Sequence, residues 1–176
     1  MRKIILYIAQ SLDGFIAKEN GDVSWLEEVP NPEKTDYGYS DFLTSIDTVI
    51  MGRATFEQVC SFDMPYPYQS KKNFVFTKNP ELPANENAAF ISENHAGFVR
   101  KLKLQQGNDI WLVGGAKTNT FFLQHNLIDQ IRLFVMPVLL GRGIPLFYKN
   151  TFKRDLQIEY YQVHSSGVSE LWYKLL

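Results

Sequence analysis

Two adjacent glycines, Gly114 and Gly115, stand between an apolar run at residues 110–113 and a stretch at 116–125 whose composition permits a helix. The run is typical of a strand buried on both faces. A strand that passes through glycines into a helix presents free backbone N–H groups and the positive end of the helix dipole, which suit a phosphate group. Because the motif is neither the G-x-G-x-x-G fingerprint nor a Walker A loop, a tight strand-to-helix turn is an equal alternative.

Other expected strands also end in residues that suit an anionic ligand. Gly52 and Arg53 follow one apolar run, and Thr77 and Lys78 follow another. In an open α/β sheet, ligands bind beyond the carboxyl ends of the strands, where such residues converge. Arg53 and Lys78 could together hold a 2′-phosphate, because guanidinium pairs with phosphate through two hydrogen bonds and ammonium acts as a point charge. The alternative is that both are solvated surface cations.

Strands and helices alternate along most of the chain, and this alternation determines where the strand ends lie. Strands are expected at residues 3–9, 48–51, 73–76, 89–91, 110–113 and 128–136, with two more at 156–164 and 168–175. Helices are expected from a cap at Thr35 to Ser45, over 55–59, from a cap at Ser92 or Asn94 to Gly107, and over 116–125, while 137–147 is expected to be an apolar loop. This pattern predicts an α/β fold with a central mixed, mostly parallel sheet, helices on both faces and an antiparallel C-terminal hairpin.

The composition argues against several classes of protein. With 176 residues the chain is expected to form a single domain, 1–176. The formal net charge is -1, without a basic block, which argues against nucleic acid or an anionic membrane as partner. The lone Cys60 rules out an intramolecular disulfide and a cysteine-only zinc site, and no metal site is expected. Since no segment reaches membrane-spanning length and the N-terminal apolar run is too short for an export signal, we expect a cytoplasmic protein.

Four motifs in order resemble a known superfamily. Residues 49–57, VIMGRATFE, resemble a segment of the dihydrofolate reductases, and residues 113–116, VGGA, are similar to their glycine pair. Residues 11–17, SLDGFIA, and 137–147, PVLLGRGIPLF, are more similar to the reductase domain of the bifunctional riboflavin-biosynthesis deaminase/reductase and its stand-alone relatives. The resemblance spans residues 3–147 and is specific for the superfamily rather than for a substrate.

This resemblance implies a dihydrofolate-reductase-like three-layer fold that uses NADPH as hydride donor. It places Ala9 and Ile16 where backbone groups hold the nicotinamide carboxamide, and it implies a cis peptide between Gly114 and Gly115. The other cofactor-binding residues that it implies are Gly52, Arg53, Thr55, Thr77, Lys78, Val113, Gly114, Gly115, Ala116, Lys117 and Thr118. Asp13, next to a glycine, is expected to shape its turn rather than to titrate.

The sequence indicates the proton donor and the substrate contacts less clearly than the cofactor-binding residues. An ungapped count back from Gly52 puts Asp36 where folate reductases carry an acidic residue, which predicts a catalytic role for Asp36. The alternatives are an ordered water as donor and, for Asp36, an acidic residue favoured at a helix start by the dipole. Trp25 falls near the tryptophan that borders the folate reductase site, and its alternative is a core aromatic.

The substrate is expected to be a small heteroaromatic molecule. Between Asp13 and Gly52 the only basic residues are Lys18 and Lys34, so the anchor that a ribose-phosphate substrate needs is missing. Phe42 and nearby tyrosines suit a flat ring instead. The sequence thus favours an NADPH-dependent reductase of a pterin- or pyrimidine-like compound. The alternatives are an NADP-binding protein of the same fold without efficient turnover and a plain α/β dimerisation module.

The C-terminal hairpin predicts a homodimer. Large side chains alternate on both faces of residues 156–175, and a sheet edge that is this apolar favours a packed second subunit.

Overall fold

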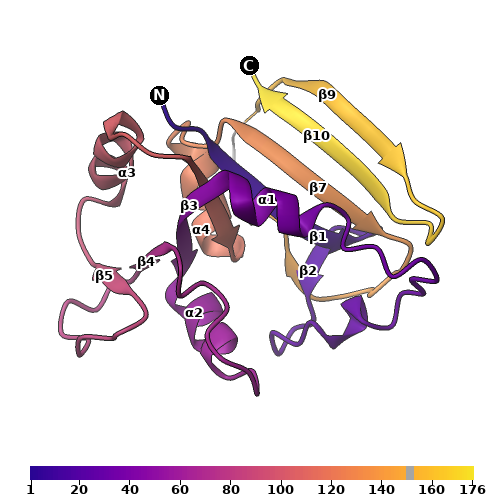
Figure 1. The fold of residues 1–176 in the computed structure, drawn as a ribbon, viewed down its shortest axis with the longest axis horizontal. Helices are drawn as coiled ribbons and strands as arrows, with labels where there is room; N and C mark the ends of the chain where they lie inside the picture. The colour runs from indigo at the N-terminus through magenta and orange to yellow at the C-terminus, as the bar shows by residue number, and fades with distance from the viewer. Residues whose placement is uncertain (150–152) are drawn as a thin grey trace.

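The computed structural model describes residues 1–149 and 153–176. An eight-stranded twisted sheet forms its centre, in the order β5-β4-β3-β6-β1-β7-β10-β9, with the N-terminal strand β1 near the middle (Figure 1). The strands of this sheet are β1 (Ile4–Ser11), β3 (Ile46–Gly52), β4 (Lys72–Phe76), β5 (Ala89–Ile91), β6 (Asp109–Gly114), β7 (Gln130–Met136), β9 (Leu156–Val163) and β10 (Ser169–Leu175). The pairs from β5 to β7 are parallel, and β10 pairs antiparallel with both β7 and β9.

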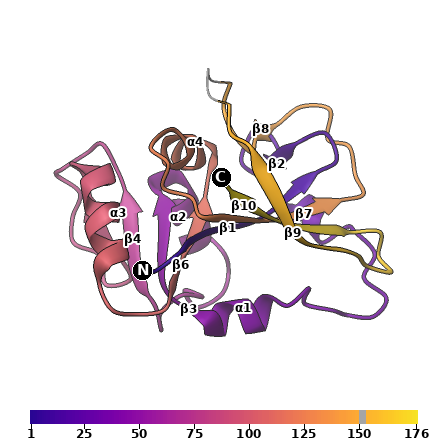
Figure 2. The same cartoon turned by 90° about the horizontal axis from the view of Figure 1, so that it is seen from above.

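Helices cover both faces of the parallel part of this sheet (Figure 2). The helices α1 (Tyr39–Ser45) and α2 (Arg53–Cys60) pack on one face, through a core cluster that contains Phe42, Phe56 and Val59. On the other face lie α3 (His95–Leu104) and α4 (Ala116–Gln124), which contribute Val99 and Phe122 to a second cluster. The predicted fold class, including the antiparallel C-terminal hairpin, is therefore confirmed.

The strand β1 explains why the sheet is so well buried at its centre. Its side chains alternate between the two clusters, since Ile4 and Leu6 belong to the α3–α4 cluster while Ile5 belongs to the α1–α2 cluster. All three side chains are at most 1% exposed. A strand segment flanked by two neighbours and covered on both faces is typically apolar throughout, as residues 4–6 of β1 are.

Two expectations about local structure were wrong. The first helix begins at Tyr39 rather than near Thr35, because Tyr37 (φ 52) and Gly38 (φ 75) adopt left-handed conformations that a helix cannot include. Thr35 instead accepts the backbone N–H of Tyr37 through Oγ1 at 3.1 Å. Within 137–147, the short strand β8 (Ile144–Pro145) pairs antiparallel with β2 (Phe15–Ala17), so this segment is not entirely a loop.

The outer strand β9 exposes apolar side chains, among them Ile158 (48%), Tyr161 (73%) and Val163 (70%). A packed second subunit would remove this surface from water, so these residues are the surface that the predicted homodimer requires. The homodimer stays a prediction, which sedimentation at micromolar concentration tests: a species of monomer mass alone would contradict it.

None of the described helices is both long and apolar enough to cross a membrane.

Candidate functional site

The candidate site lies where β3 and β6 end side by side. These strands are parallel neighbours, and their register pairs Met51 with Gly114. Each strand leads directly into a helix, so the N-termini of α2 and α4 begin next to each other. The backbone N–H of Gly115 donates to Thr55 Oγ1 at 3.0 Å, which ties the start of α4 to the first turn of α2. Two adjacent helix N-termini concentrate free N–H donors and positive potential, which is the chemistry a pyrophosphate needs.

The glycines of this site are required by close packing. A Cβ on Gly52 would lie 2.5 Å from Thr118 Oγ1, closer than a carbon and an oxygen can approach. Gly114 has a φ of 115°, a conformation that side chains disfavour, and a Cβ there would meet Asn119 Oδ1 at 3.0 Å. The Gly114–Gly115 peptide is cis, which confirms the prediction.

Asn119 belongs to this site although the sequence did not single it out. Its side chain is fully buried, and Nδ2 donates to the carbonyl of Leu146 at 3.1 Å. Its Oδ1 is buried and has no hydrogen-bond partner among the described residues. The only sequence signal was a polar residue within the expected helix after the glycine pair. Asn119 thus joins α4 to the 137–147 segment and leaves one acceptor beside Gly114.

Three cations come shortly after the ends of β3, β4 and β6. Arg53, Lys78 and Lys117 are all exposed, and Arg53 and Lys78 follow neighbouring strands, β3 and β4. Arg53 Nε donates to Glu57 Oε1 at 2.6 Å, one turn further along α2. Both side chains are about half exposed, at 47% and 56%. Ion pairs this exposed contribute little, so a phosphate can compete for the guanidinium.

The remaining cofactor candidates lie around the same strand ends. Thr77 is buried directly after β4, and its Oγ1 accepts the backbone N–H of Asn79 at 3.0 Å. Ala116 and Thr118 are buried in the first turn of α4, and Val113 is half-buried on β6. The structure therefore brings the glycines, the threonines and the cations to one edge of the sheet.

Ala9 and Ile16 lie on β1 and on β2, the strand that follows it, and both are half-buried. Asp13 holds the 137–147 segment over this end of β1, because its carboxylate accepts the backbone N–H groups of Leu140 at 3.1 Å and Gly141 at 2.7 Å. The hydrogen bond from the Ser11 hydroxyl is the main reason that the pKa of Asp13 is lowered, and these two N–H groups add to it. Asp13 thus shapes its turn, as predicted, and also joins two loops.

Both candidate substrate residues are buried. Phe42 is 2% exposed and stacks on Tyr7, with ring centroids 4.3 Å apart at 12°. Trp25 is 1% exposed and packs with Phe134 and Met136 in a third cluster, where its Nε1 has no partner among the described residues. Tyr7, which packs against both groups, connects them. The burial of Trp25 fits the core alternative, and the substrate roles of Trp25 and Phe42 stay predictions.

Asp36 is exposed and precedes α1. Its carboxylate accepts the backbone N–H groups of Gly38 and Ser40, each at 3.0 Å. Hydrogen bonds from Ser40 and Gly38 lower the pKa of Asp36, so the group is ionised at neutral pH. This geometry favours the helix-start alternative over a proton donor, and the catalytic role stays a prediction.

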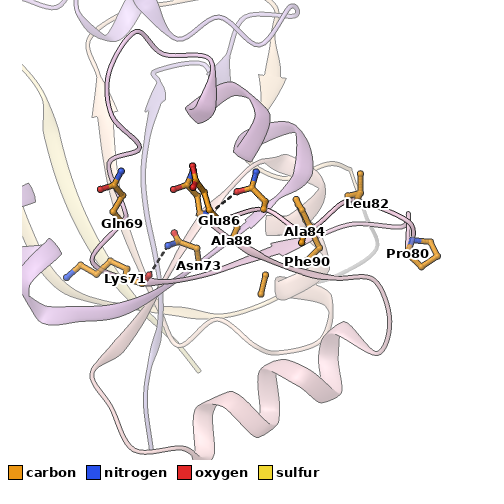
Figure 3. A pocket seen from close by; sticks show the side chains of 12 residues that line it. Gln69, Lys71, Asn73, Pro80, Leu82, Ala84, Glu86, Ala88 and Phe90 are labelled. Carbon is orange, nitrogen blue, oxygen red and sulfur yellow. Dashed lines mark hydrogen bonds between the residues drawn. The ribbon is translucent and has the colours of Figure 1, made fainter.

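An open hollow of about 970 Å³ lies elsewhere, between the start of β4 and the 80–90 segment (Figure 3). Its buried polar residue, Asn73, is fully engaged, since Nδ2 donates to the carbonyls of Tyr68 and Lys71 and Oδ1 accepts from Tyr66. None of the sequence-predicted site residues lines this hollow. Of the cofactor candidates, Thr77 and Lys78 adjoin β4, directly after its last residue, Phe76.

Comparison with known proteins places this geometry in context. A family model described as the RibD C-terminal domain matches residues 2–169. The Bacillus subtilis uncharacterized protein YwjB is 44% identical over 158 residues, which cover 90% of each protein. The crystal structure of a putative riboflavin biosynthesis protein from Shewanella sp. PV-4 superposes with a TM-score of 0.89 at 31% identity, covering 100% of this chain and 99% of that one. The Enterococcus faecalis dihydrofolate reductase complexed with NADP(H) has a TM-score of 0.69 at 17% identity, covering 98% and 96%, which shows a shared fold.

The close contact between Gly52 and Thr118 leads us to predict how substitutions there change the free energy of unfolding. Gly52→Ala places a methyl group against Thr118 Oγ1, and overpacking of this kind costs about 1–3 kcal/mol. Thr118→Ala removes the obstructing atom, so the double variant should recover most of that loss. Thermal unfolding of the parent, both single variants and the double variant measures this coupling. Additive losses would mean that the two residues do not press on each other.

Proposed function

Because the chain belongs to the RibD C-terminal domain family, we propose that it is an NADPH-dependent reductase of a small heteroaromatic, pterin- or pyrimidine-like compound. The convergence of Gly52, Thr55, Gly115 and Thr118 at two adjacent helix N-termini carries the proposal. This arrangement leaves backbone donors without side chains in front of them, as a bound pyrophosphate requires.

The residues of the site fit a dinucleotide phosphate in detail. Gly52 lets the ends of β3 and β6 approach each other closely, and the hydrogen bond from Gly115 to Thr55 sets the N-termini of α2 and α4 side by side. Gly114, Gly115 and the first turn of α4 would hold the pyrophosphate, while Arg53, Lys78 and Thr77 would hold the 2′-phosphate. NADPH, when bound, supplies a hydride to the substrate. Ala9 and Ile16 would orient the nicotinamide by backbone hydrogen bonds, and the loops joined by Asp13 would limit the access of water.

Hydride addition to a C=N bond also requires a proton on nitrogen. Asp36 is exposed and ionised at neutral pH, so a water molecule at the substrate is the better donor in this proposal. The same observation favours the second candidate function, an NADP-binding protein without efficient turnover. The two candidates share a cofactor site and differ in catalysis.

Cofactor preference tests the proposed phosphate site. We expect the protein to bind NADPH more tightly than NADH, because only NADPH carries the 2′-phosphate that Arg53 and Lys78 would meet. A charged Arg–phosphate hydrogen bond is worth on the order of 1.5–3 kcal/mol, so Arg53→Ala should weaken NADPH binding roughly tenfold or more. The same change should leave NADH binding nearly unaffected. Titration of both cofactors by fluorescence gives the four dissociation constants.

Two further variants serve as controls for that titration. Arg100→Ala removes an exposed arginine from α3, away from these strand ends, and should leave both affinities unchanged. Glu57→Gln removes the partner of Arg53 and should preserve or strengthen NADPH binding. Equal affinity of the parent protein for NADPH and NADH would refute the proposed 2′-phosphate site.

Turnover separates the two candidate functions. We expect the protein to oxidise NADPH, followed at the nicotinamide absorbance, with at least one member of a panel of oxidised pterins and pyrimidines. Asp36→Asn should change the rate at neutral pH by less than about threefold, whereas the loss of a general acid costs roughly 10²–10⁴-fold. A loss of that size with intact NADPH binding would restore Asp36 as the donor. NADPH binding without turnover of any panel member would support the binding protein.

A further inference from the structure

The two ends of the proposed cofactor site belong to separate units of the structure. The pyrophosphate end is the start of α4 at Gly114 and Gly115, which adjoins α2 in the eight-stranded sheet. In the proposed function the nicotinamide end includes Ile16 on β2, and β2 pairs with β8 in a small sheet of their own (Figure 2). A dinucleotide spans both ends, so the distance between the two units determines whether both ends of the ligand can bind at once.

Leu146 connects the two units through its backbone. Its carbonyl accepts a hydrogen bond from Asn119 Nδ2 at 3.1 Å, and its N–H donates to the carbonyl of Gly14 at 3.1 Å. Leu146 directly follows β8, and Gly14 directly precedes β2. Because Asn119 lies near the start of α4, its side chain ties this helix to the two-stranded sheet.

The strands β2 and β8 fit each other closely. Phe15 pairs with Pro145, and a Cβ on Gly143 would collide with the carbonyl oxygen of Ala17. This obstruction is backbone, which cannot turn aside as the end of a flexible side chain can. Ile16 lies between Phe15 and Ala17, so the position of β8 determines that of Ile16.

The amide of Asn119 can make this contact in one orientation only. The side chain is fully buried, and Oδ1 has no hydrogen-bond partner among the described residues. Turning the amide over would set Oδ1 against the carbonyl of Leu146, and two acceptors cannot form a hydrogen bond. A buried acceptor without a partner disfavours the folded state. The donor to Leu146 is therefore what this asparagine contributes.

Thr120 makes a second contact of the same kind. Its Oγ1 accepts the backbone N–H of Tyr148 at 2.9 Å and donates to the carbonyl of Ala116 at 2.7 Å. The side chains of Leu146 and Phe147 also pack against the α3–α4 cluster. Apolar packing holds this segment against the helix, whereas the directional hydrogen bonds set its position along the helix.

We propose that Asn119 is a positioning residue that sets the nicotinamide end of the cofactor site relative to the pyrophosphate end; this inference rests on the proposed function. Asn119 acts through Leu146 and β2 rather than by touching the reacting atoms. It holds the backbone of Ile16 where the carboxamide arrives when the pyrophosphate lies at the start of α4. Without this hydrogen bond both ends persist, but their spacing is no longer fixed, and the affinity that the nicotinamide adds is reduced.

Two ligands that differ in the nicotinamide test this inference. NADPH and 2′-phospho-ADP-ribose share the 2′-phosphate and the pyrophosphate, and only NADPH carries the nicotinamide ring. Calorimetric titration of the parent should show tighter binding of NADPH. Asn119→Leu keeps the size of the side chain and removes the donor, so it should reduce this preference about fivefold, the effect of one neutral hydrogen bond. Its affinity for 2′-phospho-ADP-ribose should change by less than about twofold.

Asn73→Leu is the matched control. Asn73 is also buried and donates through Nδ2 to backbone carbonyls, but it lies at the start of β4 beside the hollow of Figure 3. This variant should unfold at a lower temperature than the parent and keep the parent's preference for NADPH. Thr120→Val removes the second contact and should reduce the preference in the same direction as Asn119→Leu. It gives the result if thermal unfolding shows that Asn119→Leu is unfolded.

Other outcomes would overturn the inference. If Asn119→Leu weakens both ligands equally, or lowers only the unfolding temperature as Asn73→Leu does, Asn119 has a structural role alone. Equal binding of the two ligands by the parent would mean that β2 does not hold the nicotinamide, which contradicts the inference and leaves the phosphate site standing. Failure of both ligands to bind the parent would contradict the proposed function and this inference with it.

Discussion

The structure depends on the close approach of two strand-to-helix junctions, at the ends of β3 and β6. Gly52 lies so near Thr118 that a Cβ would be 2.5 Å from the threonine oxygen, and Gly115 donates to Thr55. These contacts hold the N-termini of α2 and α4 side by side. The two helices pack on opposite faces of the sheet, so the junctions also connect the two core clusters. A substitution that separates them would change the fold and the candidate site together.

The loops around this edge are held by polar contacts as well as by apolar packing on the core clusters. Asp13 joins the turn after β1 to Leu140 and Gly141, and Asn119 joins α4 to Leu146. The 137–147 segment is thus attached to two of the strand ends that would surround the cofactor. Hydrogen bonds of this type contribute about 1 kcal/mol each, so they position a loop without making it rigid.

Much of this architecture was predictable because buried parallel strands have a clear sequence pattern. The runs at 49–51 and 110–113 are apolar at every position, and each is followed by glycine, so both the strands and the grouping of their ends followed from the sequence. The start of α1 did not, because the left-handed conformations of Tyr37 and Gly38 depend on local hydrogen bonds to Thr35 and Asp36. A helix start identified from residue types alone is unreliable for this reason.

Side-chain contacts that depend on neighbouring strands were also not predicted from the sequence. Tyr7 lies in the first expected strand, and only the packing shows that its ring stacks on Phe42 and contacts Phe134. The burial of Trp25 and Phe42 is likewise a property of packing that sequence position does not reveal. Long-range pairing determines these features, whereas the glycine motifs act through the local backbone.

A crystal structure of the protein with NADP+ tests the central claim most directly. The account predicts the pyrophosphate at the start of α4 against Gly114 and Gly115, and the 2′-phosphate within hydrogen-bonding distance of Arg53 or Lys78. Density for the cofactor in the hollow beside Asn73, or anywhere away from the ends of β3 and β6, would contradict it.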